Sequence, residues 1–198
     1  MLDEKAMLKK ARPQWEFPNR VHLAAYLLPR IVRNEIPRVL DACTRFVDPV
    51  LARMAQERGY RLIVCDSDPQ DALVVKVALP GPLPWGDGEF RGVISTDTLE
   101  HLDDPQAALR EFHRLVEPGG FLILGLPIKT DGPKRLRTAI ARLSTDDADA
   151  LTWGHKWDMG TDIEVDIEAA GWAVLGRCEA YCPARFDAPC TWLLEREA

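Results

Sequence analysis

The 198-residue sequence has no apolar run that approaches the ~20 residues of a membrane-spanning helix. Residues 1–12 mix charged with apolar side chains, so they lack the continuous apolar stretch of a signal peptide. Internal repeats and low-complexity segments are absent as well. These absences argue against a membrane protein and a repeat architecture, and we expect a cytoplasmic protein.

The sequence also lacks excess positive charge and a paired set of cysteines. A net charge of -6 argues against non-specific nucleic-acid binding, which needs clustered Lys and Arg. The one basic stretch, residues 134–142, is of a kind that is more often a solvated helix face than a docking site. An odd number of cysteines suits a reducing compartment. They are Cys43, Cys65, Cys178, Cys182 and Cys190. The last three are too unevenly spaced for a zinc site, so no metal site is predicted.

A composition of 46% hydrophobic and 28% charged residues is typical of a globular chain. We therefore expect one domain over residues 1–198, with residues 1–35 as an N-terminal helical segment. Apolar residues recur at helical spacing over 21–32, although Pro29 should kink or end that helix.

Strand-like and helix-like segments then alternate. Short apolar strands are expected at 38–41, 61–65, 92–96 and 121–126. Three Asp-Pro pairs suit the N-cap and first helical position, namely Asp48-Pro49, Asp68-Pro69 and Asp104-Pro105. Buried strands alternating with helices predict a doubly wound parallel sheet covered on both faces.

The rhythm changes toward the C-terminus. Thr161 to Glu164 matches a capping box, and Gly171 should end the helix that follows. Residues 172–182 and 191–195 then predict two strands with no helix between them. Such a pair indicates an antiparallel hairpin at the end of the sheet.

Residues 83–120 resemble the central signature of the class I S-adenosylmethionine-dependent methyltransferases, and are similar to the group containing the ubiquinone-pathway O-methyltransferases. Within this segment the matching pieces are LPW (83–85), LEH (99–101) and PGG (118–120). Downstream, HKW (155–157) and AGW (170–172) resemble the family's His-containing segment and the Ala-Gly-Phe turn before its hairpin. The resemblance covers roughly residues 38–195. It implies a Rossmann-like fold with a mostly parallel seven-stranded sheet that ends in the antiparallel hairpin.

The resemblance also implies S-adenosylmethionine as cofactor and methyl transfer to a small molecule. In open α/β sheets such ligands lie at the carboxyl ends of the strands. The cofactor-binding residues expected there are Asp41, Ala42, Cys43, Asp66, Ser67, Ser95 and Thr96. Relatives place an acidic residue at the position of Asp66 on the ribose hydroxyls, whereas an Asp in a turn also commonly bonds its own backbone.

The loop after the first strand departs from the Asp-x-Gly-x-Gly-x-Gly pattern of the family. Cys43, Arg45 and Val47 stand at the three glycine positions, where a β-branched or bulky side chain resists a positive φ. Three roles are open for Arg45. Its side chain could pair with the cofactor carboxylate, fill the space beside the altered loop, or point to solvent. Leu79 stands where relatives carry an acidic residue, and the segment between Asp66 and the 83–85 turn leaves little more than one turn of helix.

Three further residues are candidates on the substrate side. His101 follows the strand at 92–96 and is a candidate general base, although in the family this position is often structural. His155 and Trp157 are candidates for lining the substrate mouth, or else pack the C-terminal segment. Residues 130–157 occupy the place of a substrate lid in relatives.

Two functions follow from these observations. The first is an active methyltransferase for a small molecule. The second is a non-catalytic protein of the same fold that has lost cofactor binding and serves as a partner subunit or scaffold. A third reading uses Arg45 to recognise an anion at the start of the helix that Asp48-Pro49 opens.

Overall fold

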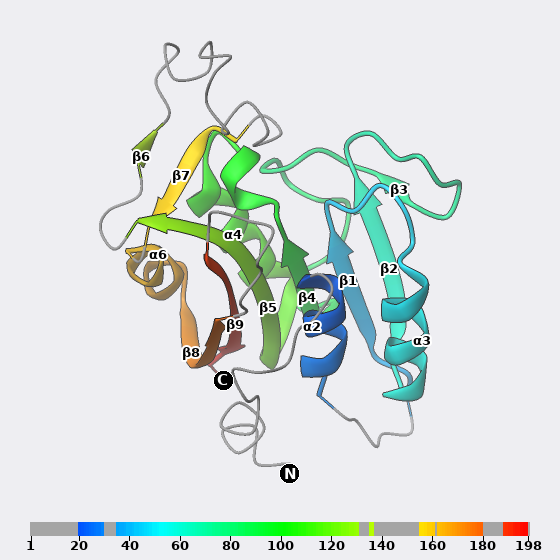
Figure 1. The fold of residues 1–198 in the computed structure, drawn as a ribbon. Coiled ribbons are helices and arrows are strands. Elements are labelled where there is room, and N and C mark those ends of the chain that lie inside the picture. Colours follow the sequence, from blue (N-terminus) through cyan, green and yellow to red (C-terminus); the bar gives the residue numbers. More distant parts are fainter. Residues whose placement is uncertain are drawn as a thin grey trace.

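In the computed structural model, the described residues are 20–29, 35–130, 135–136, 155–160, 162–179 and 188–197. Their strands form one sheet with helices on both sides (Figure 1). No helix in this part of the chain is long and apolar enough to cross a membrane.

The first half of the sheet is parallel. Its strands are β1 (Arg38–Ala42), β2 (Arg61–Asp66), β3 (Val75–Lys76), β4 (Phe90–Thr96) and β5 (Val116–Thr130). In space they follow the order β3-β2-β1-β4-β5. The chain therefore runs outward from β1 to β3 and then returns to the other side of β1. In sheets of this kind, such a reversal of order marks where ligands bind.

The second half of the sheet branches from the long strand β5. The antiparallel strand β9 (Ala188–Arg196) pairs with it from Phe121 to Ile128, and β8 (Trp172–Glu179) pairs with β9. The path β3-β2-β1-β4-β5-β9-β8 confirms the predicted seven-stranded sheet with a C-terminal hairpin. Two short strands are additional, since β7 (Trp157–Gly160) pairs with the end of β5 and β6 (Arg135–Leu136) pairs with β7.

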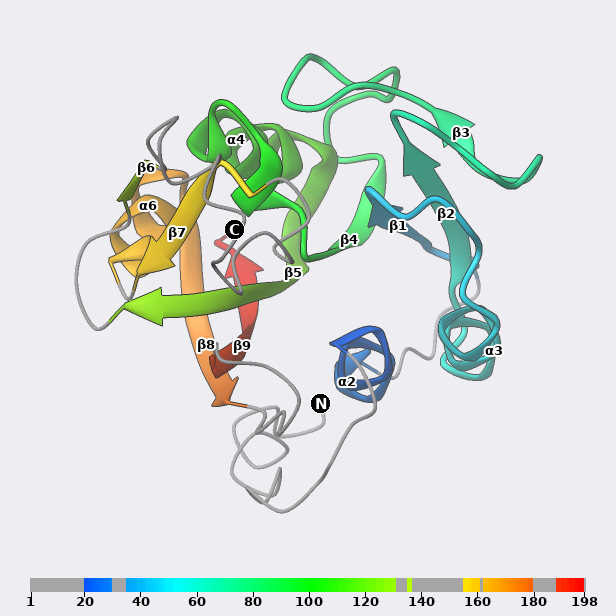
Figure 2. The same cartoon turned by 45° about the horizontal axis from the view of Figure 1, so that its top comes forward.

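Helices cover the two faces separately (Figures 1 and 2). One face carries α2 (Arg20–Leu27) and α3 (Pro49–Glu57), and the other carries α4 (Pro105–Leu115) and α6 (Ile163–Ala169). Helix α3 begins as predicted, because the Asp48 carboxylate accepts the Val50 and Leu51 N–H groups at 2.8 and 2.9 Å. Asp104 likewise accepts the Ala107 N–H at 2.9 Å at the start of α4.

Of four expected helix boundaries, two agree with the structure and two differ from it. Helix α2 ends before Pro29, as expected. No helix follows Asp68-Pro69, where the chain forms turns that lead into β3, so that expectation was wrong. Asp162, not Thr161, stands at the N-cap of α6, and Thr161 lies outside the described residues. The expected end at Gly171 is confirmed by its φ of 91°.

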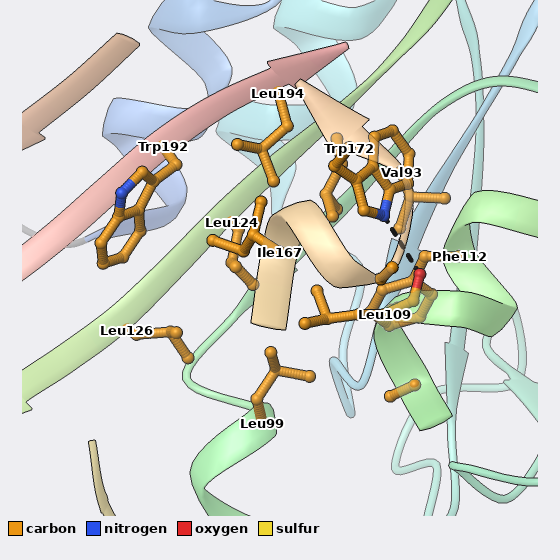
Figure 3. Packing of buried hydrophobic residues seen from close by; sticks show 14 of the residues in the cluster. Val93, Leu99, Leu109, Phe112, Leu124, Leu126, Ile167, Trp172, Trp192 and Leu194 are labelled. Carbon is orange, nitrogen blue, oxygen red and sulfur yellow. Dashed lines mark hydrogen bonds between the residues drawn. The ribbon is translucent and has the colours of Figure 1, made fainter. Parts of the chain in front are cut away.

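The hairpin is packed against α4 by a buried tryptophan (Figure 3). Trp172, at the start of β8, is 2% exposed and donates from Nε1 to the Leu109 carbonyl at 3.1 Å. Its ring meets the His113 ring edge-on, with centroids 5.3 Å apart. Phe112, Leu124 and Ile167 belong to the same buried cluster. This packing holds β8 and β9 against the body of the domain.

Candidate functional site

The carboxyl ends of β1, β2 and β4 lie side by side. Ala42 is paired with Cys65 on one neighbouring strand and with Ser95 on the other. Asp66 and Thr96 directly follow those two partners. The residues that the sequence predicted to bind the cofactor thus lie together at one edge of the sheet. The strand order reverses at the same edge.

The loop after β1 keeps a backbone turn that usually calls for glycine. Cys43 has a φ of 67°, in the left-handed region. Its N–H donates to the Cys65 carbonyl at 2.8 Å, and the Thr44 N–H donates to the same oxygen at 3.2 Å. The loop is therefore folded toward β2.

The other two replaced glycines impose no such strain. Among the described non-glycine residues, only Cys43 and Asp97 have a positive φ, so Arg45 and Val47 do not adopt one. The left-handed turn falls on the first glycine position alone, and the backbone at Arg45 and Val47 avoids the positive φ that their side chains were expected to resist. The strained residue is the smallest of the three replacements.

Arg45 points to solvent, the third of its predicted readings. Its side chain is 61% exposed and lies 3.8 Å from the Asp68 carboxylate, which is 65% exposed. Its carbonyl accepts the Gln70 N–H at 3.0 Å. Arg45 therefore links the loop after β1 to the loop after β2 and does not fill a pocket between them. An ion pair this exposed contributes little to stability.

Asp66 is a nearly buried carboxylate at the end of β2, with 7% exposure. Its Oδ1 accepts the Asp68 N–H at 2.8 Å, which is the turn-forming role that Asp commonly has. An ionised carboxylate offers about four acceptor sites on two oxygens. The turn therefore uses only part of the acceptor capacity of Asp66.

Asp41 lies one residue inside the edge and is buried, with 1% exposure. Burial raises the pKa of its carboxyl group to about 7; the Thr44 hydroxyl, donating at 3.1 Å, lowers it, and the nearby Asp48 raises it. A carboxyl group with this pKa exchanges a proton close to neutral pH.

The raised pKa of Asp41 predicts a pH-dependent stability. Because the folded state binds this proton more tightly than the unfolded state, whose pKa is near 3.8, stability falls as pH rises from about 4 to about 7. Relative to wild type, Asp41→Asn should gain about 3–4 kcal/mol in free energy of unfolding between pH 4 and pH 8. Urea denaturation at each pH measures the gain. Parallel stability profiles for the two proteins would contradict the prediction.

Thr98 connects the ends of β1 and β4 and was missed by sequence reasoning. Its buried hydroxyl lies 3.2 Å from the Thr96 carbonyl and 3.5 Å from the Ala42 carbonyl. Burial and the neighbouring Cys65 and acidic groups raise the pKa of the Cys43 thiol, while a hydrogen bond with Thr98 opposes that rise. A threonine in a loop carries no sequence signal for this role.

The substrate-side candidates also meet. His101 ends the 3-10 helix η1 (Leu99–His101), and its ring lies edge-on to the His155 ring with centroids 4.7 Å apart. The Trp157 indole donates to the Leu102 carbonyl at 2.8 Å. Most of the expected lid, residues 130–157 with the basic stretch 134–142, lies outside the described residues.

The wall beside Asp66 contains no helix. Residues 67–89 form turns and the two-residue strand β3. The sequence predicted little more than one helical turn there, and the structure has none. Leu79, at the position expected to be acidic, packs against the main apolar cluster.

Comparison with known proteins agrees with the fold described above. Residues 47–124 match the family model described as a methyltransferase domain. No curated protein matched the sequence. The structure is similar to the Burkholderia thailandensis 1,6-didemethyltoxoflavin-N1-methyltransferase, solved with 1,6-didemethyltoxoflavin and S-adenosylhomocysteine bound. The two proteins share 19% sequence identity, with a TM-score of 0.63. The match covers 98% of this chain and 77% of that one.

Two other solved structures show the range of this fold. An S-adenosylmethionine-dependent methyltransferase from Mesorhizobium loti has 17% identity and a TM-score of 0.63, covering 90% of this chain and 98% of that one. The [4+2]-cyclase SpnF has 14% identity and a TM-score of 0.64, and the match covers 96% of this chain and 85% of that one. At these identities the likeness shows the fold and leaves the chemistry to the site.

Proposed function

Because this chain has the class I methyltransferase fold and a methyltransferase-domain match over residues 47–124, we propose that it is an S-adenosylmethionine-dependent methyltransferase acting on a small molecule. The cofactor would lie across the ends of β1, β2 and β4. We also propose that the protein is cytoplasmic, because an odd number of cysteines suits a reducing compartment. We propose neither a nucleic acid nor a membrane as its partner.

The observation that carries the proposal is the left-handed turn at Cys43, which directly follows the end of β1 at Ala42, where β1 pairs with β2 next to Asp66. A glycine-type turn lets the backbone approach a ligand closely, which is its use in cofactor loops. The turn is retained here although a side chain occupies the position. A left-handed non-glycine residue costs about 1–2 kcal/mol and persists where the surrounding structure enforces it.

The proposed roles follow from position. Asp66 would accept from the ribose hydroxyls, and the backbone of Asp41 to Cys43 would contact the cofactor, together with Ser67, Ser95 and Thr96. When bound, S-adenosylmethionine supplies a methyl group already activated by its sulfonium charge. The protein then has to align the substrate nucleophile with that methyl group and exclude water. His101 is the candidate group to take the nucleophile's proton, with His155 and Trp157 on the substrate side.

A specific observation favours the second function, a non-catalytic protein of this fold. The contacts of Arg45 with Asp68 and Gln70 join the two loops between which the cofactor would lie. The helix-free segment 67–89 and Leu79 also remove features that hold adenine in relatives. A protein so altered would serve as a partner subunit or scaffold.

Isothermal titration with S-adenosylhomocysteine separates these functions. An active methyltransferase should bind one equivalent with a dissociation constant in the micromolar range, about -7 to -8 kcal/mol. Adenosine alone is the matched control and should bind at least tenfold more weakly. No heat at millimolar S-adenosylhomocysteine would overturn the methyltransferase proposal in favour of the non-catalytic one.

A further inference from the structure

Three side chains that are far apart in the sequence gather at η1. Glu100, His101 and His155 each offer one oxygen or nitrogen atom, and these three atoms lie within 4.8 Å of one another. Glu100 is fully buried, with 0% exposure, and the two histidines are partly buried. His155 Nε2 lies 3.9 Å from Glu100 Oε1. The cluster thus combines one carboxylate with two imidazoles below the protein surface.

Hydrogen bonds of the two residues that follow His155 fix its position near η1. The Lys156 N–H donates to the Glu100 carbonyl at 2.7 Å, and the Lys156 ammonium lies 2.6 Å from the Asp103 carboxylate. The Trp157 indole bond to Leu102 adds a third contact. Three bonds from adjacent residues therefore clamp the segment that carries His155 onto the segment that carries Glu100 and His101. A site held this way is largely formed before a ligand arrives.

We propose that Glu100, His101 and His155 bind a divalent transition-metal ion. Two imidazoles and one carboxylate are the ligand set of several catalytic zinc sites and of non-heme iron(II) sites. Glu100 contributes a fully buried carboxyl group, and a buried carboxylate is stabilised by a metal ion that it ligates. Three protein ligands leave coordination positions open for an oxygen of a substrate or of water.

The observed spacing is compatible with this ligation. At metal–ligand distances of about 2.1 Å, tetrahedral ligands lie about 3.4 Å apart. The longest separation in the cluster therefore has to shorten by up to about 1.4 Å when the ion binds, which requires a change of side-chain rotamer. The sequence predicted no metal site, on the uneven spacing of its cysteines, and His155 lies far along the chain from Glu100 and His101.

The metal site does not depend on the proposed function, but it would change one role within it. An imidazole nitrogen bound to a metal cannot also accept a substrate proton. The ion would then replace His101 by lowering the pKa of a substrate hydroxyl that it binds. The Thr98 bonds to Ala42 and Thr96 place this site close to the ends of β1 and β4.

Titration of the full-length, untagged, chelator-treated protein with Co²⁺ tests the proposal. We expect one equivalent to bind, with visible d–d absorption and without the near-ultraviolet band of thiolate ligation. His101→Ala, His155→Ala and Glu100→Gln should each weaken binding at least 100-fold. His113→Gln is the matched control, since His113 packs on Trp172 outside the cluster, and should bind as wild type does.

A second measurement needs no variant and therefore no assumption that each variant folds. The Co²⁺ form of the wild-type protein should show two exchangeable, hyperfine-shifted proton resonances, one from each ligating imidazole. Binding that survives His101→Ala and His155→Ala, a thiolate band, or the absence of shifted imidazole signals would overturn the site. S-adenosylhomocysteine titration of the metal-free protein tests the proposed function separately. Its outcome does not change the interpretation of the Co²⁺ experiments.

Discussion

Asp66→Asn is expected to weaken S-adenosylhomocysteine binding about 10- to 150-fold and to leave the free energy of unfolding within about 0.5 kcal/mol. The amide oxygen of Asn can still accept the Asp68 N–H, so the turn at the end of β2 is preserved. The charge and one acceptor oxygen are lost. Hydrogen bonds to a charged group contribute about 1.5–3 kcal/mol, which corresponds to the expected loss of affinity.

The substitution separates the two roles of Asp66 because the turn and the ribose would use different acceptor sites. Isothermal titration measures the affinity and urea denaturation the stability. Asp68→Asn is the matched control, since its exposed carboxylate pairs only with the exposed Arg45 side chain in the described bonds, and should change affinity less than threefold. If Asp66→Asn binds S-adenosylhomocysteine as tightly as wild type, Asp66 forms only the turn and does not accept from the ribose.

Trp172→Ala is expected to lower the free energy of unfolding by about 3–5 kcal/mol, the usual cost of truncating a buried aromatic residue. The substitution removes the bond to Leu109 and the contact with His113, and it leaves a cavity between β8 and α4 (Figure 3). Urea denaturation measures the loss.

Trp172→Phe is the matched comparison for this position. It keeps an aromatic ring but loses the indole N–H, so we expect a smaller cost, about 1–2 kcal/mol. A loss below 1 kcal/mol in Trp172→Ala would contradict the conclusion that this residue anchors the hairpin to the domain.

The sequence predicted the elements whose signals are local. Asp48 and Asp104 cap their helices because each is followed by proline and by apolar residues at helical spacing. Asp68-Pro69 has the same beginning but no helix. The Leu73 N–H, which in a helix would donate to the Pro69 carbonyl, donates instead to the Asp71 carboxylate at 2.9 Å. A local side-chain hydrogen bond therefore competes with the helix signal.

The candidate site was predicted in its location but not in its detail. Parallel strands end at the same edge of a sheet, so Asp41, Asp66 and Ser95 could be placed together from strand order alone. Which of the three replaced glycines carries the left-handed turn could not be read from residue types. The meeting of Glu100 with His155 depends on the path of a long connection, for which no periodic pattern exists.

The central claim is that a cofactor nucleoside binds where β1 and β2 end, with its ribose on Asp66. The most direct measurement is a crystal structure of the protein grown with S-adenosylhomocysteine. The account predicts density for the ligand between the Cys43 turn and Asp66, with the ribose hydroxyls within 3.2 Å of the Asp66 carboxylate, as strong hydrogen bonds require. Crystals grown at saturating ligand that show this edge closed by the Arg45–Asp68 contact, with no nucleoside bound, would contradict it.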